Sequence, residues 1–161
     1  MCEILLAEID GHVGSVGALD FQQPDLGNCA VASLTSRAPS VRKKLPRATS
    51  CVMLRLNSVR KSLEGETRPS RDTIISVVSK SFEFRSWART MLLAVGLEPD
   101  SLCEVDANGE GWSARLSAKS IVIADVVVAR SLPAGVPVRV FRVIAESSIE
   151  ELKQLCPARV G

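Results

Sequence analysis

The fold class is decided by one stretch, Ile74-Ile75-Ser76-Val77-Val78-Ser79-Lys80-Ser81-Phe82-Glu83-Phe84. Residues 74–78 form a compact apolar run, which is typical of a buried strand. Ser79-Lys80-Ser81 then opens a helix, because the apolar residues that follow recur at helical spacing: Phe84, Trp87, Ala88, Met91 and Val95. We expect this stripe to belong to the core and Gly96 to cap the C-terminal end of the helix.

The rest of the chain alternates in the same way between apolar runs and helical patterns. Further strands are expected at 4–7, 30–34, 51–56, 102–105, 121–128 and 138–144. Further helices are expected at 9–19, 39–45, 112–116 and 149–155. Ser148 and Glu151 form a capping-box pattern at the start of the last one. This alternation predicts an α/β fold with mostly parallel sheets flanked by helices.

The best linker candidate is the polar, turn-rich segment 64–70. We therefore expect two lobes. The first α/β lobe covers 1–68, the second covers 69–144, and 145–161 form a C-terminal helix that packs back on the lobes.

The net charge is only +2, but the charges are unevenly distributed. Residues 1–36 carry five acidic side chains and no Lys or Arg, residues 37–89 carry thirteen basic and four acidic side chains, and residues 90–161 carry seven basic and nine acidic ones. The basic middle third can attract nucleic acid, an anionic ligand or an acidic partner, or it can simply form solvated helix faces. Aromatic residues make up only 4%, which argues against the stacking platforms of single-strand binders.

The cysteines and the apolar segments bear on the compartment. Five dispersed cysteines form neither a paired disulfide framework nor a metal knuckle, and they suit a reducing environment. Residues 1–8 contain acidic side chains where a signal peptide needs basic ones. The most apolar stretch, 121–129, has nine residues and contains Asp125, so it is too short to span a bilayer. We expect a cytoplasmic protein with no membrane association.

The sequence contains few candidate catalytic residues or motifs. The single histidine is His12, no serine has a nucleophile-elbow frame, and neither a dinucleotide fingerprint nor a phosphate-binding loop is present. We therefore expect no enzyme activity, no metal and no cofactor. Asp106 and Asp125 are the carboxylates expected near strand ends, where either can act as a general base or merely cap a turn.

Two loops have the composition of a ligand site. Thr35-Ser36-Arg37 follows one expected strand and Ser79-Lys80-Ser81 follows another. Ligands of open α/β sheets bind beyond the carboxyl ends of strands, where helix N-termini favour anions. Each loop supplies hydroxyl donors and one cation, so both are predicted to close on a shared anionic ligand. The alternative is that the hydroxyl side chains are only helix caps.

Several motifs along the chain resemble one family. They are Leu5-Leu6-Ala7-Glu8-Ile9-Asp10, Ser36-Arg37-Ala38-Pro39-Ser40-Val41-Arg42, Ile75-Ser76-Val77-Val78-Ser79, Trp87-Ala88-Arg89-Thr90-Met91-Leu92, Ala124-Asp125, Leu132-Pro133-Ala134-Gly135, Phe141-Arg142-Val143-Ile144 and Ser148-Ile149-Glu150-Glu151-Leu152. Over nearly its whole length the chain resembles the C-terminal portion of GntR-type bacterial transcription regulators. In such regulators an N-terminal winged helix binds DNA. The resemblance implies that the portion present is a two-lobed, periplasmic-binding-like (Rossmann-like) sensor that binds an effector or mediates dimerisation.

The expected function follows from the resemblance and the two loops together. We expect an effector-sensing or dimerisation domain, a homodimer, whose effector is a small anionic metabolite. We expect no helix-turn-helix before Met1, so DNA binding is expected only if a separate or missing winged helix is supplied. Arg37 and Lys80 would pair with ligand anions, and Asp125 would accept a hydrogen bond from a ligand hydroxyl or amine. The hydroxyl donors would be Thr35, Ser36, Ser79 and Ser81.

Two alternatives belong to other classes of function. One is a small α/β enzyme that acts on an anionic metabolite with Asp106 or Asp125 as general base. The other is nucleic-acid binding through the basic middle segment.

Overall fold

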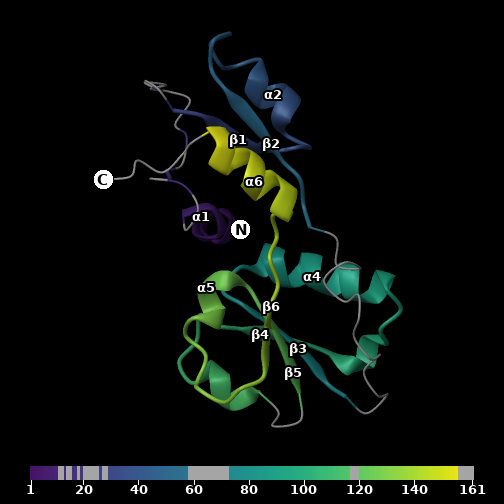
Figure 1. Ribbon diagram of the computed structural model, residues 1–161. Coiled ribbons are helices and arrows are strands. Elements are labelled where there is room, and N and C mark those ends of the chain that lie inside the picture. Colours follow the sequence, from purple (N-terminus) through teal and green to yellow (C-terminus); the bar gives the residue numbers. More distant parts are fainter. Residues whose placement is uncertain are drawn as a thin grey trace. The chain divides into compact units, whose positions relative to one another are not determined.

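The computed structural model describes residues 1–10, 13, 16, 17, 19, 26, 29–57, 73–116 and 120–155 (Figure 1). The chain divides into two compact units. Unit 1 comprises Met1–Ile4 and Ser58–Arg142, and unit 2 comprises Leu5–Asn57 and Val143–Gly161. The linker expected at 64–70 lies outside the described residues, so the lobe boundary expected there stays a prediction.

Unit 1 is built on a four-stranded, fully parallel sheet with the strand order β4-β3-β5-β6. The strands are β3 (Ile75–Ser79), β4 (Leu102–Asp106), β5 (Ile121–Ala124) and β6 (Val138–Val140). The described helical segments that connect them are α4 (Phe82–Ala94), η1 (Pro99–Ser101), η2 (Trp112–Arg115) and α5 (Val126–Ala129). Every residue of β3 is buried, as expected for a central parallel strand that is covered on both faces. The predicted α/β class with parallel sheets flanked by helices is confirmed.

Helix α4 begins and ends with the signals that the sequence predicts. The Ser81 hydroxyl accepts a hydrogen bond from the Phe84 N–H, which makes Ser81 the N-cap. Gly96 has a φ of 89°, and the N–H groups of Gly96 and Leu97 donate to the carbonyls of Leu93 and Leu92, which is a Schellman motif. The buried face is not quite the expected stripe. It consists of Phe84, Arg85, Ala88 and Leu92, while Val95 is 36% exposed.

The core of unit 1 lies on both faces of its sheet. On one face, alternate residues of β3, β4 and β5 pack with α5 and form a cluster of Val78, Val105, Ala107, Val122, Ala124 and Val128. Phe84 on α4 lies with its ring centroid 6.3 Å from that of Phe141, and the Trp87 ring lies 5.1 Å from Phe141. These aromatic contacts join the first turns of α4 to the segment that follows β6.

Two strands of unit 1 are shorter than expected. The strand predicted for 121–128 ends at Ala124, because the Asp125 carboxylate accepts the N–H groups of Val127 and Val128 and starts α5. The strand predicted for 138–144 ends at Val140. A run of β-branched residues therefore does not extend a strand past a good helix cap.

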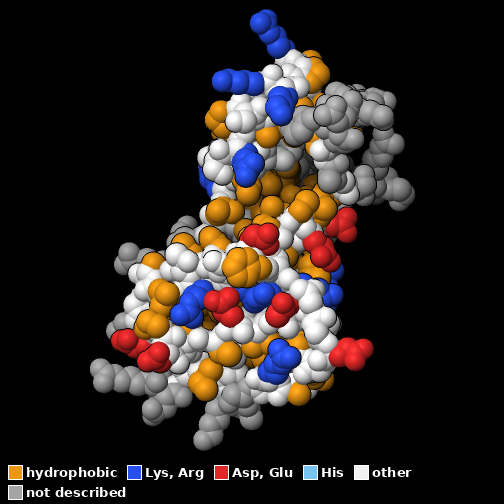
Figure 2. All heavy atoms as spheres, turned by 180° about the vertical axis from the view of Figure 1, so that it is seen from behind, with side chains coloured by type: hydrophobic (Ala, Val, Ile, Leu, Met, Phe, Trp, Pro, Cys, Tyr) orange, Lys and Arg blue, Asp and Glu red, His pale blue; other side chains and the backbone are white. Residues whose placement is uncertain are grey.

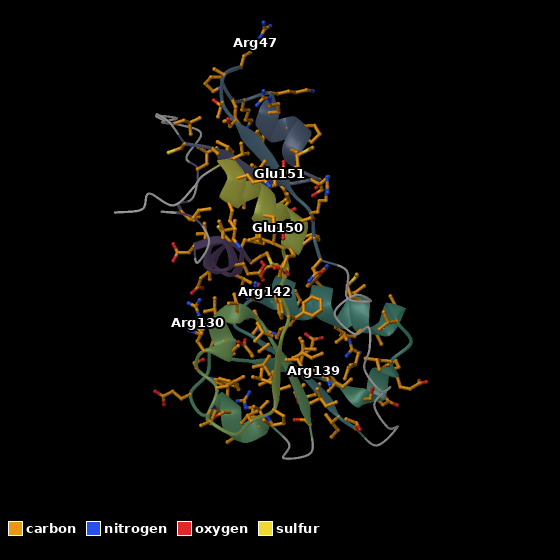
Figure 3. All side chains as sticks on the ribbon, in the orientation of Figure 1. Arg47, Arg130, Arg139, Arg142, Glu150 and Glu151 are labelled. Carbon is orange, nitrogen blue, oxygen red and sulfur yellow. The ribbon has the colours of Figure 1, made fainter. Side chains whose placement is uncertain are left out.

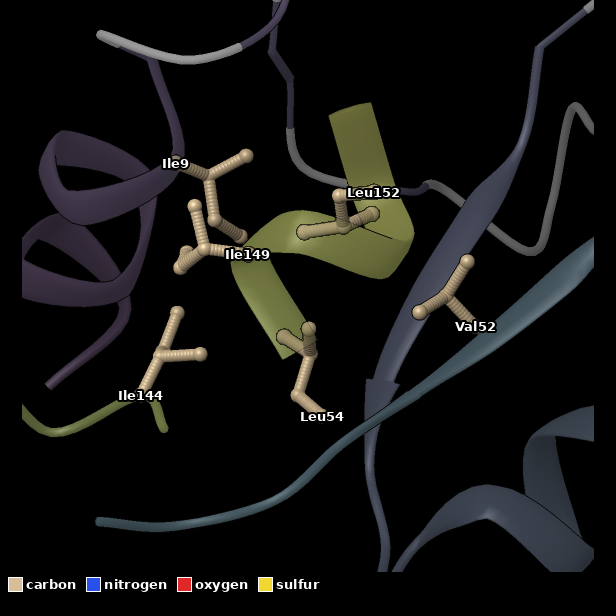
Figure 4. Close-up of a cluster of buried hydrophobic side chains, with 6 residues drawn as sticks. All are labelled: Ile9, Val52, Leu54, Ile144, Ile149 and Leu152. Atoms are coloured by element: carbon tan, nitrogen blue, oxygen red, sulfur yellow. The ribbon is translucent and has the colours of Figure 1, made fainter. Parts of the chain in front are cut away.

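Unit 2 contains a parallel pair of strands, β1 (Val31–Leu34) and β2 (Cys51–Leu54), with α2 (Ala38–Arg42) between them in sequence. Helix α6 (Glu146–Leu155) packs against β2. Helix α1 (Cys2–Asp10) contributes its residues from Leu5 onward. Figure 4 shows the core of this unit, which is formed by Ile9, Val52, Leu54, Ile144, Ile149 and Leu152.

Three predicted elements, one in α1 and two in unit 2, are corrected by the structure. The segment 4–7 is helical, because Leu, Ala and Glu favour a helix and Ile4 and Glu8 are buried one turn apart. Helix α2 ends at Arg42, three residues before the expected end at Leu45. Helix α6 begins at Glu146, so Ser148 lies inside it and is not its cap; the Ser148 hydroxyl accepts the Arg55 N–H instead, at 3.0 Å.

Candidate functional site

The sheet of unit 1 has a topological switch point between β3 and β5. From β3 the chain moves to β4 at one edge of the sheet, then crosses to β5 and β6 on the other side. Ligands of such sheets bind at the carboxyl ends of the two strands that flank this reversal. The register pairs Val78 with Ala124, so Ser79 and Asp125 occupy the next positions at that edge. The structure therefore brings two predicted site elements together, Ser79-Lys80-Ser81 and Asp125.

The last residue of β3, Ser79, and the N-cap of α4, Ser81, make local hydrogen bonds. Ser79 is fully buried, and its hydroxyl accepts the Ser81 N–H at 3.0 Å. The Ser81 hydroxyl caps α4, donates to Glu83 Oε2 at 2.7 Å and accepts from the Met1 amine at 2.9 Å. The helix-cap alternative is therefore confirmed for Ser81. The Lys80 side chain is exposed, and no hydrogen bond or ion pair engages it among the described residues.

The N-terminus of α4 already carries a negative charge. The hydrogen bond from the Ser81 hydroxyl is the main cause that lowers the pKa of Glu83 below its ordinary value of 4.5. An ionised carboxylate in the first turn complements the helix dipole. The Met1 ammonium lies 3.9 Å from Glu83 Oε2 and offsets part of this charge.

Asp125 is both a helix cap and a buried carboxylate with spare acceptor capacity. Its side chain is 1% exposed, and Oδ1 accepts the N–H groups of Val127 and Val128 at 2.8 and 2.9 Å. Oδ2 is buried and has no hydrogen-bond partner among the described residues. Because an unpaired buried polar atom costs free energy, an N–H or O–H donor brought to Oδ2 would be bound favourably.

Arg85 and Asn108 also lie at the carboxyl-terminal edge of the sheet. The sequence patterns did not predict a role for either residue. The Arg85 guanidinium donates to the Ser79 carbonyl at 2.6 Å and lies 3.4 Å from Asp106 Oδ1. The Asn108 side chain donates to the Lys80 carbonyl at 2.9 Å and to Asp106 Oδ1 at 2.8 Å. These bonds hold the loops after β3 and β4 in place. Arg85 shares a helix face with Ala88 and Leu92, which is the signal that would have marked it as buried.

The stability contributed by Asp106 should depend on pH. The Asn108 N–H is the main cause that lowers the pKa of Asp106 below its ordinary value of 3.8, and Arg85 adds to it. Since the folded-state pKa is the lower one, the stabilisation is complete above about pH 4 and is lost as the pH falls through the folded-state pKa. We expect Asp106→Asn to lower the melting temperature slightly at pH 6, and we expect this difference to disappear as the pH falls through the folded-state pKa.

Thermal melts of the wild type and of Asp106→Asn, at pH 6 and at a pH below the folded-state pKa of Asp106, test this expectation. Asn108→Ala is the matched control, because it keeps the backbone N–H and should keep most of the pH dependence. An equal difference at both pH values would contradict the role assigned to Asp106.

The other predicted loop, Thr35-Ser36-Arg37, lies in unit 2. The Thr35 hydroxyl donates to the Leu54 carbonyl at 3.0 Å. Ser36 and Arg37 are exposed, and Arg37 is the N-cap residue of α2 without a side-chain cap bond. Helix α2 has only five residues, so its N-terminus offers little dipole to an anion. The expectation that this loop shares a ligand with Ser79-Lys80-Ser81 stays a prediction.

Thr35 also lines a groove in unit 2 with a volume of about 760 Å³. Ser36 and Arg37 do not line it. Apart from Thr35, which follows β1, the groove residues come from α2, β2 and the segment between α2 and β2.

Comparisons with known proteins return no match, whether with family models, with curated proteins or with solved structures. Among the described residues, no three His, Cys, Asp or Glu side chains are grouped so that they would hold a metal ion. His12 lies outside the part of the chain that the structure describes. No helix in the described ranges has both the length and the apolar character needed to cross a bilayer.

Proposed function

We propose that unit 1 is a small-molecule-sensing α/β module that binds its effector at the carboxyl ends of β3 and β5. The observation that carries the proposal is the buried Asp125 carboxylate at the switch point, with Oδ2 unpartnered among the described residues. N-capping alone uses only Oδ1. A ligand donor would use the second oxygen.

The chemistry of this edge defines the class of effector. Asp125 Oδ2 would accept from a hydroxyl or amine, and the Lys80 ammonium would pair with an anionic group. Arg85 is already bonded to Ser79 and Asp106, so it positions the loops and does not bind the ligand. The best-fitting effector is a small anion that also carries a hydroxyl or amino group, such as a hydroxy acid or an amino acid.

A thermal-shift series with glycerate, lactate, serine and alanine tests the proposal. A ligand that binds the folded chain should raise its melting temperature by roughly 5 °C at saturation. Asp125→Asn should abolish that shift, because the new amide presents a donor where the ligand needs an acceptor. It should change the stability of the free protein by no more than about 1 kcal/mol, because Asn is an N-cap of similar strength. Lys80→Ala should weaken binding about tenfold.

The control is Asp100→Asn, which removes an exposed carboxylate of the same unit. It should leave the shift unchanged. A ligand shift that survives in Asp125→Asn would refute the assigned site, and the absence of any shift across the series would refute the effector class.

The regulatory context of the module rests on the sequence motifs. The motifs that resemble GntR-type regulators support a role in bacterial transcription regulation, in which DNA would be bound by a separate winged helix. In this proposal units 1 and 2 are the two lobes of a periplasmic-binding-like sensor, and the module is a cytoplasmic homodimer. Sedimentation analysis of the purified chain tests the dimer: a monomer at all concentrations would refute it.

A binding role fits the site better than the enzyme alternative. A general base works best when its pKa lies near the working pH, whereas the pKa of Asp106 is lowered from an already acidic value. The remaining carboxylate, Asp125, has one oxygen committed to the N-terminus of α5. Turnover of a hydroxy acid that disappears in Asp125→Asn while binding survives would favour the enzyme instead.

A further inference from the structure

The groove in unit 2 is independent of the site in unit 1. We call it the α2 groove and define it by six of its lining residues: Thr35, Pro39, Arg42, Arg47, Cys51 and Met53. Its volume of about 760 Å³ lies within the range of about 300–1,000 Å³ found for small-molecule sites.

The floor of the α2 groove is one face of β2. Side chains alternate across a strand, and Val52 and Leu54 point into the core beneath α6. Cys51 and Met53 therefore lie on the opposite face, where Met53 is 51% exposed. Parallel strands are normally covered on both faces. Because Met53 is half exposed, this face of β2 retains apolar surface that a ligand can cover.

The lining of the α2 groove contains two basic side chains, Arg42 and Arg47, and no acidic one. Residues 29–57 contain six Lys and Arg side chains and no Asp or Glu. Figure 2 shows the blue basic side chains of this region with no red among them on the face drawn. An apolar floor beside basic side chains is complementary to an anion that has an apolar body.

The two arginines that line the groove differ in whether their guanidinium groups are already hydrogen-bonded. Arg42 is fixed, because its guanidinium donates to the carbonyls of Thr49 and Arg47 at 2.5 and 3.3 Å. Those bonds hold the segment between α2 and β2 that forms one wall. The Arg47 side chain reaches outward in Figure 3, and it has no hydrogen bond or ion pair among the described residues. Arg47 is thus the cation that can pair with a ligand without breaking an existing bond.

We propose that the α2 groove binds a small organic anion with an apolar body, such as a medium-chain carboxylate. The apolar body covers Pro39, Cys51 and Met53, and the anionic group pairs with Arg47. Nucleic acid fits less well, because residues 29–57 contain no Phe, Trp or Tyr on which bases would stack.

Alkylation of Cys51 in the full chain tests the proposal directly. Octanoate is the probe, iodoacetamide is the reagent, and mass spectrometry of the peptides reports the rate at each cysteine. Octanoate should slow the alkylation of Cys51 about fivefold or more, since Cys51 lies on the floor. The alkylation of Cys103, which is exposed on β4 in unit 1, should not change and serves as the internal control.

Two variants separate charge from apolar contact. Arg47→Gln should weaken the protection of Cys51 by octanoate about threefold to tenfold. Met53→Glu, which places a negative charge on the floor at an exposed position, should weaken it more than tenfold. The matched control is Lys153→Gln, which removes one positive charge from α6 on the other side of β2 and should have no effect.

Each outcome either supports or overturns the proposed anion site in the α2 groove. The proposal is supported if octanoate protects Cys51 much more than the uncharged 1-octanol does, and if this protection is weakened in both groove variants. No protection by octanoate, or equal protection in Arg47→Gln and the wild type, overturns it. Protection by a short DNA duplex but not by octanoate also overturns it, and assigns the basic surface to nucleic acid.

Discussion

Phe84→Ala is expected to lower the free energy of unfolding of unit 1 by about 3–5 kcal/mol. Phe84 is 0% exposed, and its ring centroid lies 6.1 Å from that of Trp87 and 6.3 Å from that of Phe141. Truncation removes the buried ring and both aromatic contacts, and it leaves a cavity beneath the first turn of α4. Urea denaturation followed by tryptophan fluorescence measures the loss, since Trp87 adjoins the cavity.

The chain provides a matched control two residues away. Phe82 lies on the same helix but is 67% exposed, so Phe82→Ala should change the unfolding free energy by less than about 0.5 kcal/mol. If Phe84→Ala does not fold, Phe84→Leu should still fold with a loss of about 1–2 kcal/mol. Similar losses for Phe82→Ala and Phe84→Ala would contradict the placement of Phe84 in the core.

Glu8→Ala is expected to lower the free energy of unfolding of unit 2 by about 3 kcal/mol. The Glu8 side chain is buried, and its two carboxylate oxygens accept the N–H groups of Val143 and Ile144 at 2.6 and 2.8 Å. The two donor residues, Val143 and Ile144, are also buried, so removal of the carboxylate leaves two buried N–H groups without a partner. Urea denaturation measures the loss, and faster hydrogen exchange at Val143 and Ile144 localises it.

Two further variants make this prediction specific. Glu8→Gln keeps one acceptor oxygen and should lose about half as much free energy. Asp10→Ala removes an exposed carboxylate from the end of the same helix and should have an effect below about 0.5 kcal/mol. An equally small effect of Glu8→Ala would show that the carboxylate does not stabilise the backbone at Val143 and Ile144.

Local sequence patterns predicted the elements that have strong boundaries. The apolar run at 74–78 and the cap residues Ser81 and Gly96 specify a strand and a helix through short-range bonds alone. The α/β class and the position of Ser79 at a strand end followed from the same patterns. Asp125 was correctly placed near a strand end, although the strand was expected to continue past it.

The errors have a common physical origin. The segment 4–7 is too short for its periodicity to distinguish a strand from a helix, and burial of Ile4 and Glu8 on one helix face decided for the helix. Ser148 matches a capping box, but a long-range bond from the Arg55 N–H recruits its hydroxyl. In both cases contacts with residues far along the chain outweighed a weak local preference.

The candidate site was predicted in part. Ser79, Lys80, Ser81 and Asp125 meet at one sheet edge because the strand order places β3 beside β5, which no local pattern specifies. Arg85 and Asn108 were missed because their roles depend on the approach of β3 and β4. Thr35 lies on the α2 groove, but Ser36 and Arg37 do not.

By itself, the sequence determined the α/β class, the main strands and helices, the caps of α4 and the basic character of residues 37–89. These properties depend on side-chain periodicity, short-range hydrogen bonds and charge, all of which operate within a few residues. Only the tertiary structure decided that Glu8 accepts hydrogen bonds from the distant residues Val143 and Ile144, that Asp125 Oδ2 is buried at a switch point, and that Arg42 lines an apolar groove. These features depend on which distant polar and apolar groups are buried together, and chain topology sets that.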